Sequence, residues 1–102
     1  MDKEEVAEIG FEIVAYSGEA RSKFLLALRK HKNGGAKEDI EKLISEGKNI
    51  LVNAHNSQTK LLAKEAAGEN VELGFIFIHG QDHLMTTILL KDILENLMDI
   101  YN

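Results

Sequence analysis

The stretch VAEIGFEIVAYSGEARSKFLLA, residues 6–27, contains the pattern that predicts the fold. Residues at alternating steps of four and three lie on one face of an α-helix and form a narrow seam for a partner helix. Several seam residues are small, so the backbone of the partner helix can come close. The pattern predicts a helix in a bundle, and the seam residues are Val6, Gly10, Ile13, Ser17, Ala20, Phe24 and Ala27.

Two breaks divide the rest of the chain into two more helices. The run HKNGG, ending at Gly35, stops the first helix because Asn and Gly tolerate the left-handed backbone conformation of a helix end. A second helix is expected over residues 36–67, and after the break AGEN a third from about Val71 to Tyr101. The second helix has a seam of the same spacing, at Ile40, Ile44, Gly47, Leu51, Ala54, Gln58, Leu61 and Glu65.

Short connections make consecutive helices antiparallel neighbours. The sequence therefore predicts an all-α protein, an antiparallel three-helix up-down-up bundle. Residues 1–102 are expected to form a single domain, as the length suggests.

Composition excludes several classes of protein. A net charge of −5 lacks the positive surface that nucleic-acid binding needs. No apolar run approaches the roughly 18 residues of a membrane-spanning helix, and the first ten residues do not have the pattern of a secretory signal. We therefore expect a cytoplasmic protein with no direct membrane insertion. The absence of cysteine excludes disulfides and thiolate zinc sites.

Polar residues interrupt the third helix in the run FIFIHGQDHLMTT, residues 75–87. At about 100° per residue, His79, Asp82 and His83 lie in the middle of the stripe expected to be most buried. The opposite side is also apolar, with Phe77, Leu84, Met85 and Ile88. Because a three-helix bundle covers one stripe per helix, we expect other subunits to cover this helix. The expected buried stripe comprises Phe75, Ile76, His79, Asp82, His83, Thr86, Leu90, Ile93, Leu94 and Leu97.

A metal site is one interpretation of the polar residues. His79 and His83 are four residues apart, the spacing of a two-histidine zinc clamp on a helix. Gly80 stands where the corresponding zinc hydrolases carry their glutamate base, and Asp82 would be crowded against both imidazoles as a third ligand. A zinc enzyme is therefore disfavoured.

A hydrogen-bonded polar network inside the bundle is a second interpretation, since buried polar groups need partners. Across the hairpin between the second and third helices, residues whose numbers sum to about 140 should face each other. This register predicts Gln58 opposite Asp82 and Ser57 opposite His83.

A nucleophilic histidine is the third interpretation. A neutral, accessible imidazole can form a covalent intermediate, including one with a phosphoryl group. No glycine-rich phosphate loop is present. The phosphoryl donor would therefore be another phosphorylated side chain rather than a nucleotide.

Three segments carry a resemblance to a known family: GFEIVAYSGEARSK (residues 10–23), AHNSQT (54–59) and HGQDHLMTTILLKD (79–92). They resemble the lactose/cellobiose-type enzyme IIA components of the bacterial phosphoenolpyruvate-dependent sugar phosphotransferase system. The resemblance covers essentially the whole chain and implies a phosphotransferase component that works only with partners. It would accept phosphate from the phosphocarrier HPr on His79 and pass it to a cysteine of a cognate IIB component. The IIC membrane component would then take up a disaccharide such as cellobiose or lactose.

The resemblance also implies an assembly and a metal. Three subunits would form a homotrimer, a nine-helix bundle, in which Asp82 from each chain binds one structural Mg²⁺ on the axis. No organic cofactor is expected. His83 would either orient the phosphoryl group or His79, or make a buried hydrogen bond. Gln81 and Gln58 would either contact the phosphate or only satisfy Asp82 or solvent. The alternative function is a non-catalytic trimeric assembly module with a buried polar cluster.

Overall fold

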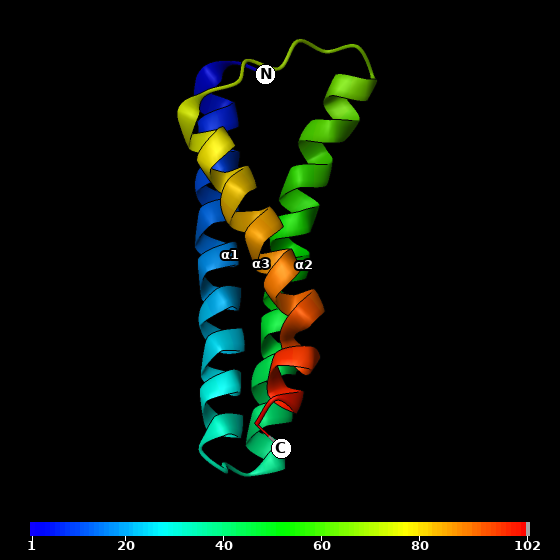
Figure 1. Cartoon of the computed structure of the whole chain (residues 1–102). Helices are drawn as coiled ribbons and strands as arrows, with labels where there is room; N and C mark the ends of the chain where they lie inside the picture. Colours follow the sequence, from blue (N-terminus) through cyan, green and yellow to red (C-terminus); the bar gives the residue numbers. More distant parts are fainter. Residues whose placement is uncertain (102) are drawn as a thin grey trace.

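Three long helices make up the computed structural model, which describes residues 1–101 (Figure 1). They are α1 (Lys3–Lys32), α2 (Lys37–Ala66) and α3 (Phe75–Asp99). α1 and α3 run in the same direction and α2 runs in the opposite one. Residues 1–101 contain no strand, so the predicted all-α, up-down-up bundle is confirmed for the single chain.

Local chemistry accounts for the helix ends. The Asp2 carboxylate accepts a hydrogen bond from the Glu5 amide at 2.9 Å and caps α1. Gly34 and Gly68 follow α1 and α2 with φ of +76° and +87°. Glycine adopts this left-handed conformation without strain, so the two predicted breaks fall where the chain turns.

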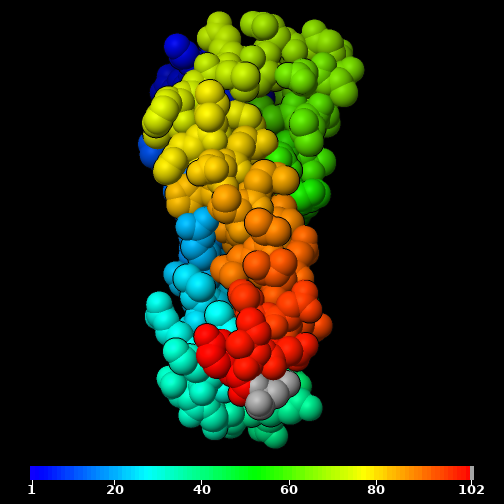
Figure 2. Space-filling view, viewed as in Figure 1, coloured from blue at the N-terminus to red at the C-terminus, as the bar shows by residue number. Residues whose placement is uncertain are grey.

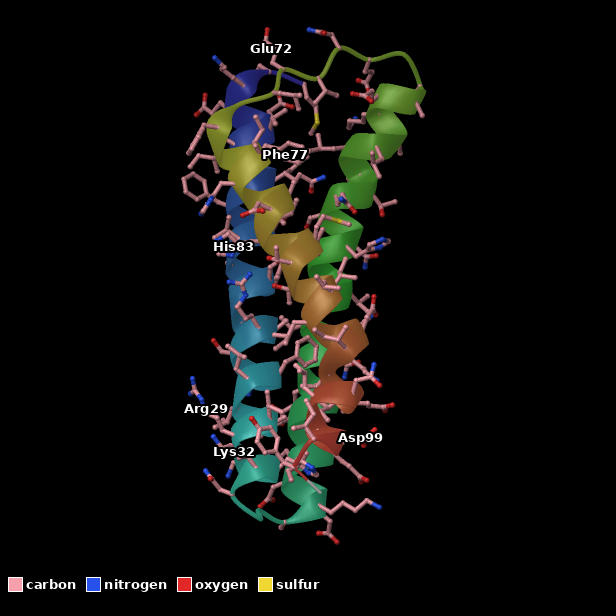
Figure 3. The ribbon with its side chains drawn as sticks, in the orientation of Figure 1. Arg29, Lys32, Glu72, Phe77, His83 and Asp99 are labelled. Carbon is pink, nitrogen blue, oxygen red and sulfur yellow. The ribbon has the colours of Figure 1, made fainter. Side chains whose placement is uncertain are left out.

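α3 starts at Phe75, later than the predicted start near Val71. The preceding segment is held by the N-terminus instead of by helical hydrogen bonds. The Glu72 amide donates to the Met1 carbonyl at 3.2 Å, and the Met1 ammonium donates to the Asn70 carbonyl at 2.9 Å. Glu72 thus lies in the connection that crosses the end of the bundle (Figure 3).

α1 is the helix against which both others pack, and α2 and α3 touch each other much less. All seven predicted seam residues of α1 are buried, which confirms that pattern. The α2 seam is confirmed for Ile40, Gly47, Leu51, Ala54 and Leu61. In α2, Ile44 and Gln58 are half-buried, Glu65 near the helix end is exposed, and Ser57 is buried instead.

Small residues let the backbones of α1 and α3 come close. A Cβ atom on Gly10 would lie 2.9 Å from the Cα of Phe77, and one on Gly80 would lie 2.9 Å from the Gly10 carbonyl oxygen. α3 therefore packs on α1 through a face centred on Gly80. This buried face comprises Phe77, Gly80, Leu84, Thr87 and Leu94.

Leu94, in the stripe of α3 predicted to be most buried, is buried in the single chain, but the prediction was wrong at the centre of that stripe. His79 and Asp82 are exposed, while Phe77 and Leu84, assigned to the opposite side, are in the core. The physical reason is the close approach at Gly80, because a residue without a side chain lets two backbones meet. Because glycine has no apolar side chain, the hydrophobic pattern of the sequence does not mark Gly80 as a core position.

The molecule is a narrow rod of 50 × 19 × 19 Å (Figure 2). Its radius of gyration is 15.9 Å, above the roughly 13 Å typical of a compact domain of this length. Such a shape leaves many large apolar side chains in contact with water. None of the helices within residues 1–101 is long and apolar enough to cross a membrane.

Candidate functional site

Two imidazoles form the centre of the candidate site. The rings of His79 and His83 meet edge to face, with centroids 4.5 Å apart and planes at 81°. Their four-residue spacing puts them one turn apart on α3. His79 is exposed and His83 is half-buried. The arrangement presents one reachable imidazole beside a second, more buried one.

His83 lies where α3 runs beside the first half of α1, in the same part of the helix as Phe77 (Figure 3). The backbone carbonyl of His83 accepts a hydrogen bond from Thr87 Oγ1 at 2.7 Å. Its ring atom Nδ1 is buried and has no hydrogen-bond partner within residues 1–101. One nitrogen of the ring is thus shielded from water.

Asp82 lies on the opposite side of α3 from the core, in a line of exposed apolar residues. We call Phe75, Ile78, Asp82, Met85 and Leu89 the outer seam of α3. These residues follow one another in steps of three and four, the repeat of a helix that packs against other helices. The four apolar members are 82%, 56%, 54% and 58% exposed, in chain order. Asp82 is therefore the polar centre of an uncovered apolar face.

Gln81 points toward α2, where its side-chain oxygen accepts a hydrogen bond from Gln58 Nε2 at 3.2 Å. The predicted pairing of Gln58 with Asp82 was wrong by one position, because a step of one residue rotates the side chain by about 100°. Ser57 donates to the Glu12 carboxylate at 3.1 Å, so the predicted pairing of Ser57 with His83 was wrong as well.

The sequence reasoning missed Arg21. Its Nη2 donates to Thr86 Oγ1 at 2.6 Å, and Thr86 Oγ1 in turn donates to the Asp82 carbonyl at 2.8 Å. This guanidinium therefore lies beside the turn of α3 that carries Asp82 and His83. A signal was present, since Arg21 directly follows the seam residue Ala20 on the helix that faces α3.

A metal site is not formed by one chain. In the described part of the chain, no three His, Asp or Glu side chains are arranged to hold a metal ion. A zinc site built from His79, Asp82 and His83 thus finds no support. Asp82 offers one exposed carboxylate.

The structure is that of a small all-helical protein with an exposed histidine, and comparison with known proteins gives the family. The family model for the lactose/cellobiose-specific IIA subunit of the phosphotransferase system matches residues 8–102. The chain belongs to this family, which confirms the resemblance seen in the sequence. It is accordingly a phosphocarrier component of a sugar phosphotransferase system.

Relatives cover nearly the whole chain. The lactose-specific EIIA component of Staphylococcus aureus strain N315 is 54% identical over 102 residues, which is 99% of this chain and 97% of the relative. The crystal structure of PtcA from S. mutans superposes with a TM-score of 0.91 at 34% identity, covering 99% of this chain and 98% of the other. In the Escherichia coli IIA(chitobiose)–HPr complex, a chain superposes with a TM-score of 0.77 at 26% identity, covering 99% and 95%.

Proposed function

We propose that His79 is the phosphoryl acceptor of this carrier and that HPr is the donor. The observation that carries the proposal is the exposed His79 imidazole, paired with the ring of His83 at 4.5 Å. A related IIA is known in complex with HPr. An exposed ring can meet a phosphohistidine of another protein, since phosphoryl transfer depends on positioning and on charge stabilisation.

The chemistry is a transfer in two steps. A ring nitrogen of His79 attacks the phosphorus, so that its N–P bond forms while the N–P bond of the HPr histidine breaks. A cysteine thiolate of the cognate IIB then attacks, forming an S–P bond while the His79 N–P bond breaks. Through the IIC component this phosphate reaches a disaccharide such as cellobiose or lactose, on the cytoplasmic side of the membrane.

Neighbouring polar groups assist the exposed imidazole in this proposal. His83 can donate a hydrogen bond to a phosphoryl oxygen, and Gln81, tied to Gln58, supplies an amide two residues along the chain from each histidine. The protein has a net charge of −5, and phosphorylation makes it more negative. Basic docking surfaces on the partners would therefore favour their association.

A homotrimer would bury the outer seam of α3. Its three-four repeat favours parallel packing of α3 from three chains, which brings three Asp82 carboxylates together. Three carboxylates at such short distances from one another must share protons or bind a cation. Oxygen-only ligands suit a hard ion, so Asp82 from each of three chains would hold Mg²⁺, which neutralises their charge and has a structural role.

Phosphorylation by purified phospho-HPr tests the acceptor. Intact-mass spectrometry should find one added phosphate on the wild-type chain and none on His79→Ala. His83→Ala should keep part of the label. His55→Ala, which removes an exposed histidine of α2, should keep all of it. Full labelling of His79→Ala would disprove the assignment.

The second candidate is a non-catalytic trimeric assembly module, favoured by the exposed apolar seam alone. In this case the chain would assemble but accept no phosphate. The labelling experiment therefore separates the two functions.

A further inference from the structure

Arg21 has an unusual hydrogen-bond partner where α1 lies beside α3. Its Nη2 atom donates to the Thr86 hydroxyl at 2.6 Å, and the residue is half-buried. Within residues 1–101 Arg21 forms no ion pair with a carboxylate, whereas Lys23 of the same helix pairs with Glu46. A guanidinium usually binds acidic groups, so its bond to a neutral hydroxyl of α3 needs an explanation.

Thr86 connects Arg21 to the backbone of α3. Its hydroxyl donates to the Asp82 carbonyl at 2.8 Å, so its oxygen lone pairs are free to accept from Arg21. The same hydroxyl lies 3.3 Å from the His83 carbonyl. Hydrogen bonds in such a chain polarise and strengthen one another. Arg21 is therefore tied, through one side chain, to the turn of α3 that carries Asp82 and His83.

This link lies on the face of α3 that carries both histidines. His79, His83 and Thr86 follow one another in steps of four and three, which puts their side chains on one side of the helix. The rings of His79 and His83 meet on this face. Thr86 ends the row, and Arg21 is bound to it there.

The link has a physical role because the closest contact between α1 and α3 has no interlocking side chains. At this contact Gly80, the residue after His79, meets the backbone of Gly10. Two glycines let the helices approach, but they do not resist a rotation of α3 about its own axis. Such a rotation would turn the imidazoles relative to an approaching partner. The hydrogen bond between Arg21 and Thr86 opposes it.

We propose that Arg21 is a positioning residue for phosphoryl transfer, which acts through Thr86 on the direction of the His79 and His83 side chains. The inference rests on the proposed role of His79 as the acceptor. In this role Arg21 needs no contact with the reacting atoms. Phosphoryl transfer depends on the alignment of acceptor and donor, so a small rotation of α3 slows it.

Hydrogen exchange tests the link without a phosphoryl donor. In an α-helix the amides of residues 86 and 87 donate to the carbonyls of Asp82 and His83. Relative to the other amides of α3, these two should exchange about two- to fivefold faster in Arg21→Met, because one hydrogen bond that steadies the turn is lost. An unchanged relative exchange rate in Arg21→Met would overturn the proposal.

Two further variants make the exchange test specific. Arg21→Lys keeps the charge and a donor, so it should restore part of the protection. Lys23→Met is the matched control, because it removes an equal charge from the side of α1 that faces α2. It should leave the relative exchange of residues 86 and 87 unchanged.

The second test measures single-turnover phosphate transfer from phospho-HPr. Arg21→Met and Thr86→Val should each lower the rate at saturating donor about two- to fivefold, with little change in the donor concentration that gives half the maximal rate. The double variant should be no slower than either single one, because both remove the same link. Thr86→Ser, which keeps the hydroxyl, should restore nearly the wild-type rate.

Three outcomes of the rate measurement would contradict the proposal: an unchanged rate in Arg21→Met, losses that multiply in the double variant, or an equal slowing in Lys23→Met. If His79→Ala were labelled normally while hydrogen exchange changed as expected, the error would lie in the assignment of His79 and not in the link through Arg21.

Discussion

Gly10 of α1 and Gly80 of α3 lie where the two backbones are closest. At Gly10 the neighbouring atoms belong to the backbone of Phe77, which cannot rotate out of the way as a side chain can. At Gly18, on the same helix, a Cβ atom would meet nothing within 4 Å. An added methyl group should therefore change the stability of the protein in opposite directions at these two glycines.

Gly10→Ala should lower the free energy of unfolding by about 1–3 kcal/mol, since the helices must separate to admit the methyl group. Gly18→Ala should raise it by about 0.5–1 kcal/mol, because alanine favours the helix and nothing is displaced. Urea unfolding at one fixed protein concentration measures both. Equal effects of the two changes would contradict the close approach of α1 to Phe77.

At the scale of elements, α1 and α2 are linked by an ion pair near the middle of the bundle. Lys23 Nζ lies 2.7 Å from Glu46 Oε2. The hydrogen bond from Lys23, together with its charge, holds the pKa of Glu46 below the usual 4.5. The same bond and charge raise the pKa of Lys23 above the usual 10.5. Both shifts mean that the charged pair is favoured in the folded state.

The sign of the pH effect follows from these shifts. The stability that Glu46 contributes to the folded state is present above pH 4.5 and is lost as the pH falls through its lowered pKa. The stability that Lys23 contributes to the folded state is present below pH 10.5 and is lost as the pH rises through its raised pKa.

Glu46→Gln should therefore be less stable than the wild type near neutral pH. The difference should disappear in acid and shrink at high salt, because the pair is partly exposed. Thermal unfolding of both proteins at a series of pH values measures this difference in stability. Glu41→Gln, which removes a longer and more exposed contact with Lys37, should show little change at any pH.

At the scale of the whole molecule, the outer seam of α3 is an apolar face that the rod leaves uncovered. Leu89→Lys places a charge in this seam, so it should shift the sedimentation of the proposed trimer to that of a monomer at micromolar concentration. Leu26→Lys, which changes a leucine of α1 that is 41% exposed, should leave the trimer intact. A wild-type chain that sediments as a monomer would rule out the assembly.

Asp82→Leu tests the centre of the same seam. Replacing three close carboxylates by leucine removes their repulsion and completes the apolar packing, so the trimer should melt at a higher temperature. The wild type should lose stability when a chelator removes Mg²⁺, whereas Asp82→Leu should be insensitive to it. Zinc found by elemental analysis, and lost in His83→Ala, would contradict the proposed metal site.

The periodicity of the chain was enough to predict much of this protein. The spacing from Val6 to Ala27 predicted every buried residue of α1, because a helix that packs on two neighbours repeats its contacts every three or four residues. The motif from His79 to Asp92 predicted the family, which the comparisons confirm. These features depend on local pattern and composition, and both are visible in the sequence.

Only the tertiary structure decided which face of α3 points toward the core. Periodicity gave α3 two apolar faces, and the face predicted to be most buried, with His79 and Asp82, is the exposed one in the single chain. The choice is made where Gly80 meets the Gly10 carbonyl, a contact between residues 70 positions apart. That contact buries Phe77 and Leu84 and leaves His79 and Asp82 facing outward. Gly10 belongs to the periodic seam of α1, but no pattern in α3 marks Gly80 as its partner, and therefore the exposure of the site follows only from the fold.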